Sequence, residues 1–205
     1  MIGGVYNVSL IVDGRTVETR PLRVNDDPEV VLTSAERKRM FDMAMDIHTL
    51  QPTVTDASAA HASLTRQTTE LATTIGGRSD IPADVKASFD AFNKELAALA
   101  PKLTTPQGRG GGGGRGGATE SLVVKVGQAK SGLMAGMSPG DQTMRAYTEV
   151  KAQTAKTIAD LNAVIAKAAT LSATLAGHNL TLTVPAPVPA PSAAPAKRTS
   201  SGAER

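Results

Sequence analysis

The sequence predicts a mainly α-helical protein in which a β-hairpin precedes an antiparallel bundle of three to four helices, two of them long. Three observations lead to this prediction. Apolar residues alternate with polar ones over much of the first two dozen positions, which is the period of a strand. Apolar and small residues then recur at steps of three and four over residues 33–77 and 138–177, as in helices that pack side by side. A glycine-rich stretch separates the two helical halves, and a proline-rich tail follows them.

Composition excludes several classes of function. The 205 residues include no Cys and no Trp, and only two Tyr and three Phe. Without cysteine the chain has no thiol nucleophile, thiolate zinc site or disulfide, and with so few rings it is poorly supplied for stacking on sugars or bases. The formal net charge of +3 decides little about partners. Residues 1–12 do not read as a secretory signal, and no apolar run approaches the ~20 residues of a membrane helix, so we expect no membrane partner.

The first segment reads as two strands joined by a tight turn. Tyr6, Val8, Leu10 and Val12 fall on one face of the first strand, and Asp13-Gly14 is a dipeptide that readily takes the positive φ angles of a hairpin turn. A second extended run follows over residues 15–24. Its Pro21 cannot donate a ladder hydrogen bond, so we expect this strand to lie at a sheet edge or to carry a bulge there.

The apolar face of this hairpin needs a cover, because two strands alone are marginal in water. Either the helices that follow cover it, or the remaining strands of its sheet lie in sequence outside this chain. The residues of the face are Tyr6, Val8, Leu10, Val12, Leu22 and Val24.

The first long helix is expected to begin at a capping box in which Thr33 and Glu36 each satisfy a backbone N–H. Pro52 predicts a kink or a break in it, and Gly76-Gly77 predicts its end. The seam of apolar or small residues behind the cap comprises Met40, Met43, Ile47, Leu50, Val54, Ala57, His61, Leu64, Thr68, Leu71 and Ile75.

Two shorter helices and a second long one are expected to follow. One opens near Asp80 and is stopped by Pro101, and another resumes near Thr119. The last begins at a capping box from Ser138 to Asp141 with proline at its first position, and it ends at Gly177. The tail from Val184 is expected to be extended, mobile and without buried residues. The predicted divisions are residues 1–28 (hairpin), 33–103 (two helices), 104–118 (flexible Gly/Arg loop), 119–177 (two helices) and 184–205 (disordered tail).

The Gly/Arg loop superficially resembles segments that contact RNA phosphates. It has two arginines, Arg109 and Arg115, eight glycines and no aromatic ring, whereas such RNA-binding segments normally repeat many times with interleaved aromatics. It also lacks the Gly-Lys-Ser/Thr of a phosphate loop. A flexible connection between helices is therefore the favoured interpretation, and nucleic-acid binding is the lesser one.

Titratable side chains do not assemble into a recognisable active or metal site. His48 and His61 are 13 positions apart with Pro52 between them, so we expect His61 to be a partly buried histidine bonded to a neighbour. Asp42 and Asp46 share a helix face that we expect to be solvated. Asp26-Asp27 is expected to form a plain turn. We therefore predict no catalytic residue, no metal ligand and no cofactor.

A resemblance to a known family rests on the hairpin. The runs Gly4–Gly14, Arg20–Val24 and Asp27-Pro28 resemble the G-x-Y-x-V-x-L-x-V-D-G, P-L-x-V and D-P stretch near the C-terminus of large bacterial Asp-box (BNR-repeat, sortilin-type) β-propeller proteins, often labelled glycosyl hydrolases. In that family the stretch closes an immunoglobulin-like sandwich and a helical region follows. The close match covers about 28 residues.

The resemblance implies a non-catalytic C-terminal structural or interaction module of a larger exported or periplasmic protein, with a protein partner. No catalytic residue can be carried over, because the propeller motifs are not in this sequence. The alternatives are an independent helical protein-binding module of the coiled-coil type and, third, a nucleic-acid binder through the Gly/Arg tract. A hydrolase in its own right is disfavoured by the residue inventory.

Overall fold

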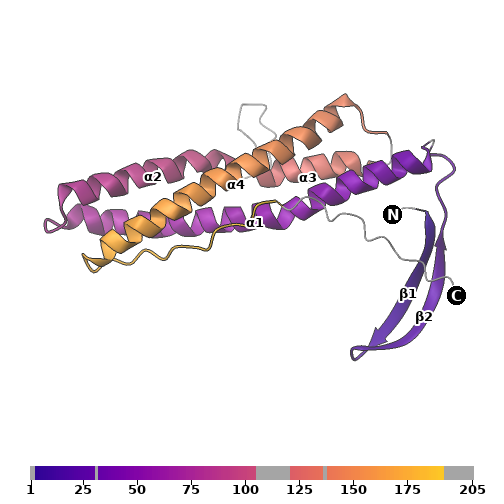
Figure 1. The fold of residues 1–205 in the computed structure, drawn as a ribbon, viewed down its shortest axis with the longest axis horizontal. Helices are drawn as coiled ribbons and strands as arrows, with labels where there is room; N and C mark the ends of the chain where they lie inside the picture. The colour runs from indigo at the N-terminus through magenta and orange to yellow at the C-terminus, as the bar shows by residue number, and fades with distance from the viewer. Residues whose placement is uncertain (1–2, 31, 105–120, 136–137, 192–205) are drawn as a thin grey trace, which may run out of the picture.

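The structure is a computed structural model that describes residues 3–30, 32–104, 121–135 and 138–191. It confirms the predicted fold class: a two-stranded antiparallel hairpin projects from one end of an elongated bundle (Figure 1). Helices α1 and α4 run along the bundle, whereas α2 and α3 are shorter and follow one another along its length. The elements are β1 (Gly4–Val12), β2 (Arg15–Val24), α1 (Ser34–Gly77), α2 (Ala83–Leu103), α3 (Leu122–Leu133) and α4 (Asp141–Ala176).

The hairpin turns where the sequence predicts. Asp13 and Gly14 have φ angles of 48° and 76°, which is the positive region that a tight turn requires. The register shifts between Leu10, which pairs with Glu18, and Ile11, which pairs with Thr16. Val17 is therefore the extra residue of a β-bulge, and the irregularity lies there and not at Pro21, which pairs with Asn7.

Helix α1 begins at the predicted capping box and ends at Gly77. The Thr33 hydroxyl accepts from the Glu36 N–H at 3.2 Å, and the Glu36 carboxylate accepts from the Thr33 N–H at 2.8 Å. The predicted alternative of a break at Pro52 is wrong, because the helix continues through it. Pro52 removes one helical bond, but Leu50 and Val54 on either side of it are both buried in the core, and this packing holds the helix together.

Two predicted helix ends are corrected, and a third is confirmed. Pro101 lies inside α2, which continues to the buried Leu103. Helix α4 begins at Asp141 with Gly140 as its N-cap, so Ser138 forms no capping box. The predicted end of α4 at Gly177 is confirmed, because the helix ends at Ala176 with Gly177 as its C-cap. Gly177 keeps a right-handed conformation, and the left-handed residue that redirects the chain is Asn179 at φ 57°. The end of α2 depends on the burial of Leu103 in the core, which local patterns do not report.

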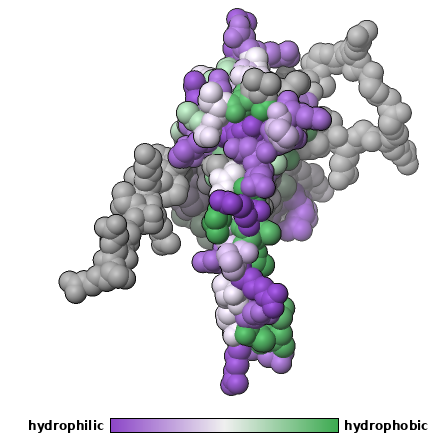
Figure 2. Space-filling view, turned by 90° about the vertical axis from the view of Figure 1, so that its right-hand side faces the viewer, coloured by the Kyte–Doolittle hydropathy of each residue, from purple (hydrophilic) through white to green (hydrophobic). Residues whose placement is uncertain are grey.

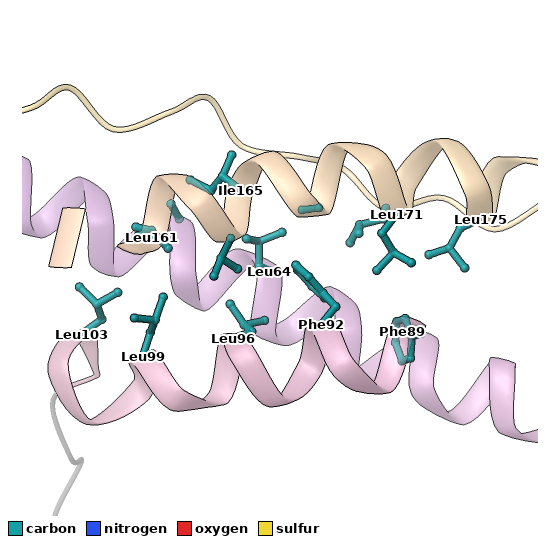
Figure 3. Packing of buried hydrophobic residues seen from close by; sticks show 14 of the residues in the cluster. Leu64, Phe89, Phe92, Leu96, Leu99, Leu103, Leu161, Ile165, Leu171 and Leu175 are labelled. Carbon is teal, nitrogen blue, oxygen red and sulfur yellow. The ribbon is translucent and has the colours of Figure 1, made fainter. Parts of the chain in front are cut away.

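The bundle has two apolar cores placed end to end. The first is formed by the second half of α1, α2, the second half of α4 and residues 180–188, and Figure 3 shows its Leu and Phe side chains meeting between the helices. The second is formed by the first half of α1, α3 and the start of α4. Helix α4 is long and apolar enough to cross a membrane by length and composition, but Leu161, Ala168 and Leu175 are fully buried in the first core.

The C-terminal tail differs from its prediction. Residues 180–191 are extended, as expected, but Leu180, Leu182 and Val188 are buried against the bundle. The prediction that the tail from Val184 buries nothing is therefore wrong at Val188. The predicted loop at 104–118, apart from Thr104, and the tail from 192 to 205 lie outside the described residues.

Phe89→Ala is expected to lower the free energy of unfolding by about 3–5 kcal/mol, because the ring is 1% exposed and its removal leaves a cavity. Phe41→Ala is the matched control, since that ring is 40% exposed, and it should change the free energy by about 1 kcal/mol or less. Urea unfolding followed by circular dichroism measures both. Equal losses in the two variants would contradict this assignment of the core.

Candidate interaction surface

The hairpin carries most of the apolar side chains that the described residues leave open to water. Val5 and Val17 are 66% and 64% exposed, and Figure 2 shows apolar side chains on the surface of the hairpin below the bundle. Both faces contribute, since Tyr6 and Leu22 pair on one face while Ile11 lies on the other. The exposed apolar residues of the hairpin are Val5, Tyr6, Val8, Leu10, Ile11, Val12, Val17 and Leu22.

Helices α1 to α4 do not cover this surface. Within the described ranges neither strand packs against a helix, and each strand has one edge without a neighbouring strand. The face is not uniformly apolar, because Arg20 and Glu18 form an ion pair of 2.6 Å opposite Val8 and Leu10. The sequence left two ways to cover the hairpin, helices of this chain or strands outside it, and the structure excludes cover by helices α1 to α4. Open edges and apolar faces of this kind favour association with further strands.

A single arginine organises the junction between hairpin and bundle. Arg37, in the first turn of α1, donates to the carbonyls of Val30 at 2.8 Å and Leu32 at 3.3 Å. It also donates to the Asp27 carbonyl at 3.3 Å and lies 3.7 Å from the Asp26 carboxylate. The Asp26-Asp27 region is thus a turn, as predicted, and one guanidinium ties it to the start of α1.

An apolar groove lies beside this junction. It encloses about 440 Å³ between the turn, α1 and α3. Three methionines line it, Met40, Met45 and Met134, and Phe41 lies at its side. Unbranched methionine side chains adapt to varied partners, so the groove adds apolar surface to the bundle beside the junction.

Asp46 is not on a solvated face, contrary to the prediction. It is 8% exposed and accepts hydrogen bonds from the Tyr147 hydroxyl at 2.6 Å and from the Lys151 ammonium of α4. Burial alone would raise the pKa of Asp46, but these two bonds and the positive charge of Lys151 outweigh it and lower the pKa. Burial and the bond to Asp46 raise the pKa of Tyr147. The i, i+4 spacing of Tyr147 and Lys151 shows that they share a helix face, but it does not show which residue they face.

The histidines lie apart and serve different contacts. His61 is buried, as predicted, and its Nε2 lies 3.0 Å from the Leu96 carbonyl of α2. His48 lies near Gln51 and the ammonium of Lys130. His178 is at the end of α4. In the part of the chain that the structure describes, no three His, Asp or Glu side chains converge as a metal site would require.

The seam of α1 is used within this chain. Its residues from Met40 to Ile75 are buried against α2, α3 and α4, except Leu71, which is half-buried. Arg109 and Arg115, on which the nucleic-acid hypothesis rests, lie outside the described residues. Comparison with protein-family models, curated proteins and solved structures finds no match for this chain.

Asp46→Asn is expected to destabilise the chain by about 1–2 kcal/mol at pH 7, because Lys151 then faces a neutral amide. The pKa of Asp46 is lowered by folding, so its contribution is present above the unfolded value of about 3.9 and is lost as the pH falls through the lower folded value. The difference in unfolding free energy between wild type and variant should therefore shrink at acid pH. Urea titrations between pH 7 and pH 2 measure it.

Asp42→Asn is the matched control on the same helix. Asp42 pairs with Lys38 on the exposed side, so its loss should change the unfolding free energy by less than about 0.5 kcal/mol at either pH. A similar loss in both variants would contradict a special role for Asp46.

Proposed function

We propose that this chain is a non-catalytic structural and interaction module from the C-terminal part of a larger exported protein of the Asp-box β-propeller class. The hairpin supplies the closing strands of an immunoglobulin-like sandwich, and the bundle serves as a spacer or docking element. The observation that carries the proposal is the apolar hairpin that its own helices leave open. The resemblance of the first 28 residues to the closing hairpin of that family supports it independently.

The hairpin has the properties expected of two strands taken from a larger sheet. The bundle buries its own apolar side chains in two cores, and neither core contains a residue of the hairpin. The hairpin has two free edges and exposed Val, Leu and Ile side chains on both faces, which is a poor arrangement in water. Neighbouring strands would pair with the free edges, and a second sheet packed about 10 Å away would bury the apolar side chains of one face.

The alternative of a helical module that completes a bundle with another chain has less support. The α1 seam that suggested it is already buried in this chain, so such a partner would have to use another surface. Nucleic-acid binding through the Gly/Arg tract remains a lesser hypothesis.

The reading frame upstream of the Met1 codon tests the proposal most directly. An open frame that encodes Asp-box repeats and the earlier strands of a sandwich is the expected result. An in-frame stop codon beside a ribosome-binding site would overturn it.

Leu10→Lys in the protein that this frame encodes tests the role of the hairpin face. Glu18 lies opposite Leu10, so a lysine leaves the hairpin intact but places a charge where the second sheet packs. The sandwich should lose at least about 3 kcal/mol of stability by thermal unfolding, whereas the chain of 205 residues alone should change by no more than about 0.5 kcal/mol.

Ser9→Lys is the control for that measurement. Ser9 bonds to Thr19 at 2.8 Å on the opposite face of the hairpin, so lysine there stays in water in either protein. Equal effects of the two lysines on the sandwich would contradict the proposed packing of the Leu10 face.

A further inference from the structure

Residues 180–188 lie along the bundle as an extended segment held by side chains of α1 and α4 (Figure 1). The segment runs antiparallel to α4, since Leu182 is bonded to Ser172 and Val188 to Asn162. The ten residues from 162 to 172 rise about 15 Å in a helix, and six residues from 182 to 188 span about 19 Å when extended like polyproline. The two lengths are similar, so an extended segment of this length reaches from Ser172 to Asn162.

Two carboxamide side chains hold the backbone of this segment. Asn162 of α4 accepts from the Val188 N–H and donates to the Val188 carbonyl, both at 2.9 Å. Gln67 of α1 does the same for Thr183, at 2.7 Å to the N–H and 3.0 Å to the carbonyl. Each amide therefore bonds to both the N–H and the carbonyl of one extended residue, and these bonds do not depend on that residue's side chain. Ser172 adds a bond of 2.7 Å to the Leu182 carbonyl.

Apolar side chains supply the rest of the contact. Leu180 and Leu182 are buried in the first core and Val184 is half-buried, which is the period of two that an extended chain gives on one face. Val188 is buried next to Asn162. Pro185 and Pro187 between these anchors have no N–H to satisfy, and their fixed φ angles reduce the entropy lost on ordering.

Hydrogen bonds also fix the chain just before this segment. Arg78, just after α1, donates to the His178 carbonyl at 2.8 Å and is held by Asp80 through bonds of 3.0 and 2.5 Å. The Arg78 guanidinium lowers the pKa of Asp80 to about 2, so the pair stays charged at neutral pH. No charged side chain of residues 180–188 takes part, because the segment contains none.

We propose that the surface of α1 and α4 that holds residues 180–188 is a binding site for extended, uncharged, proline-containing peptides, and that residues 180–188 are its resident occupant. Paired amide bonds to the backbone, apolar anchors and prolines between them are features of a site that receives a peptide in trans. The proposal is independent of the hairpin and goes beyond the proposed function. In the intact chain the covalent link keeps the resident segment at a high effective concentration, so an external peptide competes poorly.

The test separates the resident segment from the bundle after folding. A protease recognition sequence is inserted between Gly177 and His178 of the full chain, and a fluorescent peptide with the sequence of residues 178–191 is the probe. Fluorescence anisotropy is expected to show at least about tenfold more bound probe after cutting than before it. A cut chain that keeps its helical circular dichroism but takes up no probe would overturn the proposal, as would equal binding before and after cutting.

A second variant covers the case in which the cut chain unfolds. Val188→Asp in the uncut chain places a charge at the buried anchor, which weakens the resident segment and leaves α1 and α4 unchanged. The wild-type probe should bind this variant at least about tenfold more tightly than it binds the wild-type chain. If neither cutting nor this substitution increases binding, the proposal fails.

Substitutions of Gln67 and Asn162 test the amide contacts. Gln67→Ala and Asn162→Ala in the cut chain should each weaken probe binding about tenfold or more, because each removes two hydrogen bonds. Gln128→Ala, at an exposed position of α3, is the matched control and should leave binding unchanged. Equal affinities in all three variants would show that the probe binds elsewhere and would overturn the proposal.

Discussion

The bundle depends on the burial of one continuous apolar seam along α1. Ile47, Val54 and Leu64 on this seam are essentially inaccessible to water, and they contact two different cores. Helices α2 and α3 each complete only half of the length, so α1 and α4 must stay continuous for both cores to exist. This requirement explains why Pro52 is tolerated inside α1. The loss of one backbone bond is small beside the burial of the seam on both sides of the proline.

Polar groups inside the bundle connect elements that the apolar seam alone would not align. Asp46 joins α1 to α4 through Tyr147 and Lys151, and His61 joins α1 to α2 through the Leu96 carbonyl. Gln67 and Asn162 join the two long helices to residues 180–188. Asp46 and His61 are buried and would be costly without their partners, so each favours one relative placement of the helices.

The bundle and the hairpin differ in how much of their apolar surface is buried. The bundle encloses most of its leucines, its isoleucines and two of its phenylalanines, whereas the hairpin leaves valines on both faces and leucines on one face in water. The bundle therefore buries most of its apolar side chains within the described residues, and the hairpin does not. The methionine-lined groove beside Arg37 places further apolar surface at the point where the two parts meet.

Much of this architecture follows from local pattern. The alternation from Tyr6 to Val12, the Asp13-Gly14 turn, the capping box at Thr33 and the three-four spacing of the helices determine element types, because each reports a backbone period or a local hydrogen bond. The same spacing indicates that His61 lies on a buried face. The helix ends differ from the local pattern near Pro101, where α2 continues to the buried Leu103, and near Ser138, where α4 begins at Asp141 after the Gly140 N-cap. Only the tertiary structure decided that Asp46 faces Tyr147 and that Gln67 and Asn162 bind an extended segment, because these contacts join residues far apart in the chain and no periodic pattern reports them. The tertiary structure also decided that no helix covers the hairpin, because the direction in which the hairpin leaves the bundle is not a local property.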